Sequence, residues 1–438
     1  MSRTTFAVAV ASTLCAHQAA AAGFIDDSKA SITARNFYFN GDNRDGAANP
    51  SKQEEWGQGF ILDYKSGFTE GTVGFGLDAL GLLGIKLDSG KGTAYNSGSS
   101  GGGQLFPSKS DNRAEDEFGS LGATAKMRIS KTELRLGTLL PKLPVVNYND
   151  GRLLPQTFEG GQINSSEIKN LNLVAGKLEH AKARNSTSGD SLSIAGANSR
   201  TGQRSNAFYY AGGDYKLSKD LTAQYYYGNL EDFYTQHFLG LKHNLSLPVG
   251  SLKTDLRYFY SDSDGKNASQ EGRLDGYKSS GKSGGTGEVD NRTWSVLSTY
   301  SLSGHSFGAG YQQSNGNSDF PFLNQGDGSV AYLITNKQIG KFQRAGERTW
   351  LAQYGYDFAH LGLRGLTTSV SYLAGDHIQA AGTGSEWERD FTLAYVVPDG
   401  KLKGLGMTWR NASIRSGVTS QRDQDQNRII LSYTVALF

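Results

Sequence analysis

Residues 121–129, LGATAKMRI, decide the fold, because apolar and polar residues alternate in this stretch one by one. The apolar parity consists of Leu121, Ala123, Ala125, Met127 and Ile129, and the polar parity of Gly122, Thr124, Lys126 and Arg128. Successive side chains of a β-strand point to opposite faces, so a period of two predicts a strand with one apolar and one polar face.

The same period recurs from about Ser28 to the last residue, and no comparable stretch has helical spacing after residue 22. Further examples are residues 73–79, 252–260, 366–372, 391–395 and 429–437. Short connections (130–131, 217–220, 302–305, 360–365) alternate with long Gly/Ser/Asp/Asn-rich ones (88–117, 184–205, 261–291, 315–346). An antiparallel meander with tight turns at one end and long loops at the other is typical of outer-membrane β-barrels.

Composition narrows the class further. The chain has 438 residues, 57 Gly, 1 Cys, a formal net charge of +2 and a mean hydropathy of −0.47. It lacks a stretch of about 20 apolar residues, which excludes a helical membrane protein, and its single cysteine excludes a disulfide scaffold. The sequence has no basic patch of the kind that would indicate a nucleic-acid partner.

Residues 1–22, MSRTTFAVAVASTLCAHQAAAA, have the three-part layout of a secretory signal peptide. Arg3 precedes an apolar core from about Phe6 to Ala16, and small residues occupy positions 19–22. We expect cleavage near Ala22, which leaves residues 23–438 as a single outer-membrane β-barrel domain without cysteine.

The polar parity is rich in Gly, Ser, Thr, Asn and charged residues along most of the predicted strands. The alternative is a soluble β-sandwich or β-solenoid, but a protein with an apolar outside and a polar inside fits this pattern better. About 416 residues at about 23 per strand with its connection predict an antiparallel transmembrane barrel of about 18 strands.

The last predicted strand ends with Phe438, an aromatic carboxy-terminus that resembles the terminal signal of bacterial outer-membrane proteins. Phe438 lies one step out of phase with the apolar parity of residues 429–437. We therefore expect the bacterial outer membrane as the location. The expected partners are its lipid and lipopolysaccharide and, through the last strand, the barrel-assembly machinery.

Several stretches resemble the OprD-type substrate-specific porins of pseudomonads. They are residues 23–40 (GFIDDSKASITARNFYFN), 128–141 (RISKTELRLGTLLP), 151–162 (GRLLPQTFEGGQ), 230–236, 346–350 (GERTW) and 395–397 (YVV). The resemblance runs in order along the chain and implies an 18-stranded barrel whose inward-folded loops constrict the lumen. It also implies passive uptake of small solutes that carry a carboxylate.

Basic residues fall largely on the polar parity, and a cation that faced lipid near the membrane midplane would cost about 2–4 kcal/mol. These residues are Arg35, Lys126, Arg128, Arg135, Arg257, Arg410 and Arg428. A column of guanidiniums in a narrow pore offers a carboxylate successive bidentate partners. We therefore expect a basic ladder that binds anions and passes them along.

The resemblance assigns Arg35 and Arg410 to strand positions of this ladder and Arg152 to the constriction loop. Some members of the family have an Arg where this chain has Thr408 and a Lys where it has Ala394. The ladder of this chain is therefore expected to take a different route, with contributions from Arg44 and Arg184 in loops.

Two other interpretations of the charges stay open. The arginines can instead pair with carboxylates and stiffen the wall, and Asp78, Asp232, Asp255, Asp319 and Asp390 can form either such pairs or an opposing acidic patch. The family has a branch for basic amino acids and a branch for aromatic and cyclic monocarboxylates. The segments GFIDDSKASI and RLLPQTF favour the second branch.

An outer-membrane phospholipase or an omptin-like protease is the main alternative from another class, and a structural or adhesive barrel is a second one. His377 stands beside Asp376 as an adjacent acid–base pair, and no nucleophile motif accompanies it. The sequence contains no metal-ligand spacing, so we expect no cofactor, no metal and no enzymatic activity.

Overall fold

The computed structural model describes residues 23–44, 51–95, 103–195, 203–323 and 330–438. Its main sheet contains β1 (Lys29–Asn43), β2 (Lys52–Lys65), β3 (Val73–Asp88), β4 (Glu117–Ile129), β5 (Thr132–Leu139), β8 (Thr157–Ser165), β9 (Leu171–Lys182), β10 (Gly189–Ser191), β11 (Phe208–Lys216), β12 (Leu221–Leu230), β13 (Tyr234–Ser246), β14 (Ser251–Ser263), β15 (Asp290–Leu302), β16 (His305–Gly316), β17 (Arg348–Asp357), β18 (Leu366–Asp376), β19 (Gly382–Val396), β20 (Gly406–Val418) and β21 (Gln424–Ala436). β6 (Lys142–Leu143) and β7 (Val146–Asn147) form a separate small hairpin, and the helical segments are η1 (Gly265–Ala268), α3 (Gln270–Leu274) and η2 (Phe358–Leu361). In the described part of the chain, no helix is long and apolar enough to cross a membrane.

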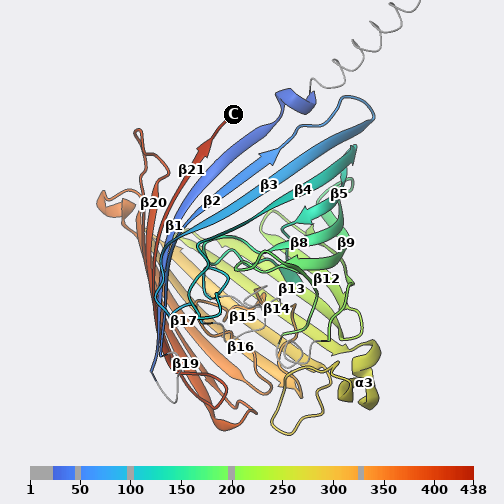
Figure 1. Ribbon diagram of the computed structural model, residues 1–438, viewed down its shortest axis with the longest axis vertical. Coiled ribbons are helices and arrows are strands. Elements are labelled where there is room, and N and C mark those ends of the chain that lie inside the picture. Colours follow the sequence, from blue (N-terminus) through green and yellow to red (C-terminus); the bar gives the residue numbers. More distant parts are fainter. Residues whose placement is uncertain (1–22, 45–50, 96–102, 196–202, 324–329) are drawn as a thin grey trace, which may run out of the picture.

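Eighteen strands close into an antiparallel barrel (Figure 1). Closure is made by β1, which pairs with β2 on one side and with β21 on the other, from Ser31 opposite Ala436 to Asn43 opposite Gln424. Among the described residues, the short strand β10 pairs only with the end of β9, and it is not counted among the eighteen. A closed sheet has no unpaired edge, which a membrane-spanning sheet requires. The prediction of a barrel of about 18 strands is confirmed.

The two ends of the barrel differ in their connections. β1 starts and β21 ends at the end with short turns, where residues 130–131 join β4 to β5 and residues 303–304 join β15 to β16. The opposite end carries the long connections, among them residues 264–289 between β14 and β15 and residues 317–347 between β16 and β17. This is the layout expected from the sequence, and it assigns the short turns to the periplasm and the long loops to the outside.

The alternation of β4 has the predicted effect on burial. Leu121 is 80% exposed on the outer surface, whereas Thr124 and Lys126 on the opposite parity are buried. Phe75 and Leu77 on neighbouring β3 are also exposed. The outer wall of the barrel is therefore apolar, and lipid covers it.

The hydrophobic clusters lie inside the barrel, where long loops fold back onto the lumen face of the wall (Figure 1). In one of them, Phe106 and Leu153 from two loops pack with Phe39 of β1. Gly57 makes room for this packing, because a Cβ at that position would overlap the Phe106 ring. Small residues on the lumen face thus allow the loops to enter, and the inward-folded loops expected from the sequence are confirmed. The predicted signal peptide, residues 1–22, lies outside the described residues.

Candidate functional site

The lumen wall carries a cluster of cations where β20, β21 and β1 lie side by side. Arg410 of β20 stands directly opposite Arg428 of β21, and Arg428 in turn stands opposite Phe39 of β1. Like charges directly opposite one another destabilise a sheet. The stability of the wall therefore does not explain why two arginines occupy these positions. The Arg428 side chain is buried, donates to the carbonyl oxygen of Gln338 at 2.6 Å, and lies 5.9 Å from the centre of the Phe39 ring.

The loop between β5 and β8 adds a further guanidinium to this cluster. Arg152 lies 5.1 Å from the centre of the Phe39 ring and donates to Oε1 of Gln104 at 3.1 Å. Arg35 of β1 holds this loop, because it donates to the Arg152 carbonyl oxygen at 2.8 Å and pairs with Asp150 at 2.7 Å. Phe39 therefore lies near two guanidiniums, Arg152 and Arg428, that come from different elements.

Arg184 completes the arginine cluster from the connection between β9 and β10. Its side chain is buried, and it lies near enough to Arg428 and to Glu55 to interact with both charges. We name Arg35, Arg152, Arg184, Arg410 and Arg428 together the lumen arginine cluster. All five members are among the ten basic candidates named from the sequence.

A cavity of about 310 Å³ adjoins the cluster at Arg410. Lys337, from the loop between β16 and β17, and Asp390 of β19 also line it, together with the hydroxyl residues Ser306, Ser369, Ser371 and Thr392. Lys337 donates to Oε1 of Gln353 at 3.2 Å. Within the described ranges, the Arg410 side chain has neither an ion-pair partner nor a hydrogen-bond acceptor. The cavity therefore presents to the lumen a guanidinium with no direct partner among the described residues, and the Asp390 carboxylate on the same cavity lies near enough to interact with its charge.

Lys337 has an altered protonation equilibrium. Burial lowers the pKa of its ammonium group, the nearby Asp390 carboxylate opposes this change, and Arg257 adds to it. The Lys337 ammonium group therefore interacts with charges on two strands, Asp390 of β19 and Arg257 of β14, because its loop lies in the lumen between them.

Two buried glutamates hold the inward-folded loops. Glu388 of β19 accepts hydrogen bonds from three consecutive backbone N–H groups, Gln338 at 3.1 Å, Ile339 at 3.0 Å and Gly340. Glu55 of β2 does the same for the loop between β3 and β4. It accepts from Leu105 at 3.1 Å, Phe106 at 3.0 Å and Gln104. Several N–H groups that converge on one carboxylate form a strong, charge-assisted anchor. These two anchors fix the path of the loops through the lumen.

The other five candidates from the sequence lie elsewhere. Arg135 of β5 pairs with Glu133 of the same strand at 2.5 Å. Lys126 pairs with Asp78 at 2.6 Å, and Arg128 lies 4.1 Å from the centre of the Phe68 ring, both near the turn between β2 and β3. Arg44 lies at the long-loop end, where it pairs with Asp42 and with Asp425 at 2.9 Å each.

Arg257 of β14 pairs with Asp255 and lies 4.0 Å from the centre of the Tyr332 ring. It joins the lumen arginine cluster only indirectly, through the loop that carries Tyr332 and Lys337. Carboxylates on the wall thus pair with three of these cations, Lys126, Arg44 and Arg257. This agrees with the second interpretation of the sequence, in which lumen cations pair with carboxylates and stiffen the wall.

Lys337, Glu55 and Glu388 were missed from the sequence. Glu55 and Glu388 lie at positions of their strands that face the lumen. A carboxylate at a lumen-facing position is the one feature of the sequence that could have pointed to them. Lys337 gives no such signal, because it sits in a long connection without periodicity.

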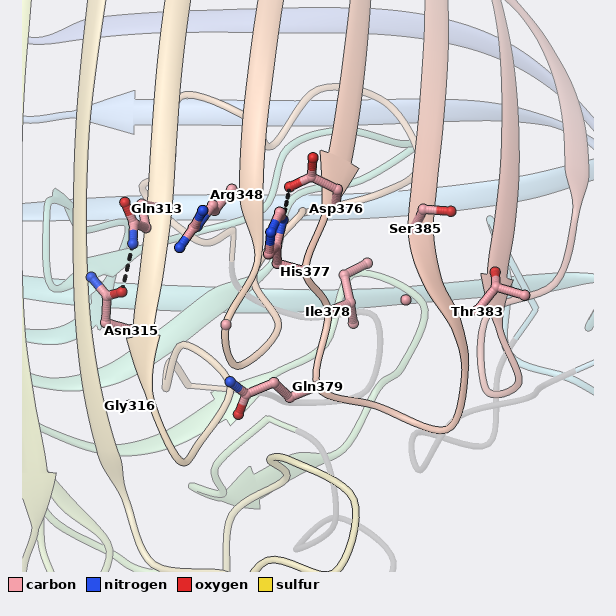
Figure 2. A pocket seen from close by; sticks show the side chains of 12 residues that line it. Gln313, Asn315, Gly316, Arg348, Asp376, His377, Ile378, Gln379, Thr383 and Ser385 are labelled. Atoms are coloured by element: carbon pink, nitrogen blue, oxygen red, sulfur yellow. Dashed lines mark hydrogen bonds and ion pairs between the residues drawn. The ribbon is translucent and has the colours of Figure 1, made fainter.

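The acid–base pair of the enzymatic alternative lies on the outer rim of the barrel (Figure 2). Nδ1 of His377 is 2.6 Å from Oδ1 of Asp376, and Ser385 and Thr383 line the same cavity. Among the described residues, neither hydroxyl group is hydrogen-bonded to the His377 ring, and no group of three or more metal-ligating side chains occurs. The pair therefore lacks the contact to a nucleophile that a hydrolase of this kind uses.

A closed antiparallel barrel with an apolar outside, a polar lumen and loops folded into that lumen defines an outer-membrane porin. The family model described as outer membrane porin, OprD family, matches residues 22–437. The chain belongs to the OprD family of outer-membrane porins.

Relatives and solved structures agree with this assignment. The chain is 39% identical to the porin-like protein GalP of Pseudomonas putida over 99% of this chain and 97% of that protein. It is 32% identical to Porin D of Pseudomonas aeruginosa over 98% and 95%. The crystal structure of P. aeruginosa OccK8 (OprE) has a TM-score of 0.87 at 63% identity and covers 95% of this chain and 100% of that chain. A crystal structure of P. aeruginosa OpdK with vanillate has a TM-score of 0.82 at 35% identity and covers 94% of this chain and 100% of that chain.

Proposed function

We propose that this porin takes up small solutes that carry a carboxylate, with aromatic or cyclic monocarboxylates favoured, along the cations of its lumen. The observation that carries the proposal is Arg410, whose guanidinium lines a lumen cavity without a direct partner in the described ranges and stands directly opposite a second arginine on the next strand. A carboxylate can accept two hydrogen bonds from such a fork and offset the repulsion between the two arginines.

The proposed path uses the lumen arginine cluster and Lys337. Arg35, Arg152 and Arg428 come from separate elements and lie within contact of one another or of the same ring, so an anion can move from one to the next without crossing apolar wall. The likeness to OpdK, which was crystallised with the aromatic carboxylate vanillate, supports this substrate class.

Uptake into liposomes tests the proposal. We expect liposomes with the purified porin to take up benzoate faster than arginine at equal concentration, because the lumen cations attract the anion and repel the cation. Faster uptake of arginine would favour the basic amino-acid branch of the family instead, and uptake of neither solute would contradict the proposal.

We also propose that residues 1–22 are an export signal cleaved near Ala22, and that the barrel-assembly machinery binds β21 and the carboxy-terminal residue. At this end the Phe438 carbonyl oxygen accepts a hydrogen bond from Ala30 N at 3.2 Å, and the residue is 68% exposed with one edge-to-face ring contact, to Tyr64. Most of the residue can therefore contact another protein while its backbone helps to close the barrel.

Phe438→Ala should lower the amount of folded porin in the outer membrane about tenfold, because the exposed ring is removed while the backbone hydrogen bond from Ala30 N to the Phe438 carbonyl oxygen is kept. Immunoblots of outer-membrane fractions measure this amount. Leu274→Ala, at an 81% exposed residue of the external helix α3, is the control and should leave it unchanged. Equal amounts for the wild type and Phe438→Ala would contradict recognition of this residue.

A further inference from the structure

The cavity in Figure 2 lies on the outer wall of the barrel, and the lumen chemistry does not use it. Its volume is about 570 Å³, and β16, β17, β18 and β19 contribute to it with the loop that joins the last two. In β17, Arg348 shares the parity of the exposed Trp350, whereas Thr349 between them is buried. Gln313 and Asn315 share the parity of the outward Phe307 in the same way. The polar side chains of this cavity therefore face away from the lumen.

Strand register places a row of aromatic side chains on the outer wall beside the cavity. Tyr311 stands opposite Trp350, Trp350 opposite Ala374, and Ala374 opposite Trp387, so three aromatic rings lie in one row across four strands. The Tyr311 and Trp350 ring centres are 4.6 Å apart. Rows of exposed Trp and Tyr on an outer-membrane barrel mark the interface between hydrocarbon and headgroups.

The cavity begins one row further toward the long loops. Gln313 stands opposite Arg348, and Arg348 stands opposite Asp376. Each of them is displaced by two residues from the aromatic row, about 7 Å along the strand. The polar row therefore lies on the long-loop side of the aromatic row, which is the direction of the outer-leaflet headgroups.

The donors in this row suit a phosphate. Figure 2 shows Arg348 between Gln313 and His377. In the described part of the structure, Arg348 has no carboxylate within ion-pair distance, because Asp376 pairs with His377 at 2.6 Å instead. Gln313 donates to Asn315 at 2.7 Å, so the Asn315 amide remains available as a donor. A planar guanidinium with amide and hydroxyl donors beside it is the arrangement that binds a phosphate bidentately.

We infer that this outer-wall cavity binds a phosphorylated sugar headgroup of lipopolysaccharide. The outer leaflet supplies this ligand at the height of Arg348, and its acyl chains then lie against the aromatic row and the apolar wall below. Thr383 and Ser385 line the other side of the cavity and can bond sugar hydroxyls. The inference depends on the placement in the outer membrane and is independent of the solute that the lumen conducts.

Native mass spectrometry of the full-length porin with added lipid A tests the inference. The wild type should retain diphosphorylated lipid A about tenfold better than dephosphorylated lipid A, and Arg348→Gln should lose about tenfold in affinity for the phosphorylated form. Asn315→Asp, which adds a repelling carboxylate, should lose a similar factor.

Arg292→Gln is the matched control. Arg292 also faces outward, on β15, but it is already paired with Asp290 at 2.6 Å, so this change should alter retention less than about twofold. Wild-type retention by Arg348→Gln, or an equal loss in Arg292→Gln, would overturn the inference. Displacement of lipid A by an equal concentration of inorganic phosphate would show a site for free phosphate and overturn the lipid assignment.

A channel measurement separates this inference from the proposed function. Arg348→Gln should leave the single-channel current and the benzoate uptake unchanged, because the residue faces away from the lumen. Loss of benzoate uptake in this variant would contradict its placement on the outer wall, whereas failure of benzoate uptake in the wild type would leave the lipid site untouched.

Discussion

Replacement of Arg410 by glutamine should lower benzoate uptake into liposomes about tenfold while the barrel stays folded. A hydrogen bond to a charged group contributes about 1.5–3 kcal/mol, and about 1.4 kcal/mol corresponds to a factor of ten. Arg410 lines the lumen cavity without a protein partner for its guanidinium in the described ranges, so its charge is available to a solute. Its removal also relieves the repulsion with Arg428 opposite, so the wall should lose no stability.

Arg389→Gln is the matched control for this change. Arg389 lies on the adjacent strand β19 but shares the outward parity of Trp387, and it donates to Oδ1 of Asn411 at 3.0 Å. We expect wild-type uptake from this variant, with circular dichroism to verify that both variants are folded. Unchanged benzoate uptake in Arg410→Gln would remove Arg410 from the solute path.

The barrel could be predicted from the sequence because lipid and lumen impose opposite requirements on successive residues. Residues 121–129 show this most clearly, since Leu121 is 80% exposed to lipid and Lys126 is buried on the lumen side of the same strand. A shift of one residue would place Lys126 in lipid, so the pattern also fixes which face of the strand turns inward. Connection lengths then fixed which end of the barrel carries the loops.

The face of each cation could be predicted, but its partner could not. Lys126 and Arg410 have the same parity signal in the sequence, yet Lys126 is paired with Asp78 of the neighbouring strand and Arg410 is not paired among the described residues. The difference arises from the register between strands and from the side chains that a loop places beside them. Neither is encoded in the local period of two.

Loop residues were the least predictable part of the site. Glu388 binds Gln338, which precedes it by 50 residues, and this contact forms only because the loop between β16 and β17 folds back into the lumen. Arg152 was placed in the constriction by resemblance to the family rather than by periodicity. The structure locates it beside Phe39, and its role in solute binding stays a prediction.

Replacement of Glu388 by alanine should raise the single-channel current and make it noisier, because it frees the loop that narrows the lumen. The change removes the acceptor for the backbone N–H groups of Gln338, Ile339 and Gly340. A buried donor without a partner costs about 1–3 kcal/mol. Because three donors lose their acceptor at once, we expect the loop to leave its present path. Lys337 adjoins this segment and should move away from the Arg410 cavity with it.

Recordings in planar bilayers measure this effect, and two further variants test whether the loss of the loop anchor causes it. Glu55→Ala should release the loop at residues 104–106 in the same way, whereas Glu388→Gln should be intermediate because an amide oxygen can still accept. Glu133→Gln is the control. Glu133 is also a lumen-face glutamate, but it bonds Arg135 of its own strand and holds no loop, so its current should match that of the wild type. A quiet current of wild-type size in Glu388→Ala would show that other contacts hold this loop, and Glu388 would then be a wall residue without influence on the channel.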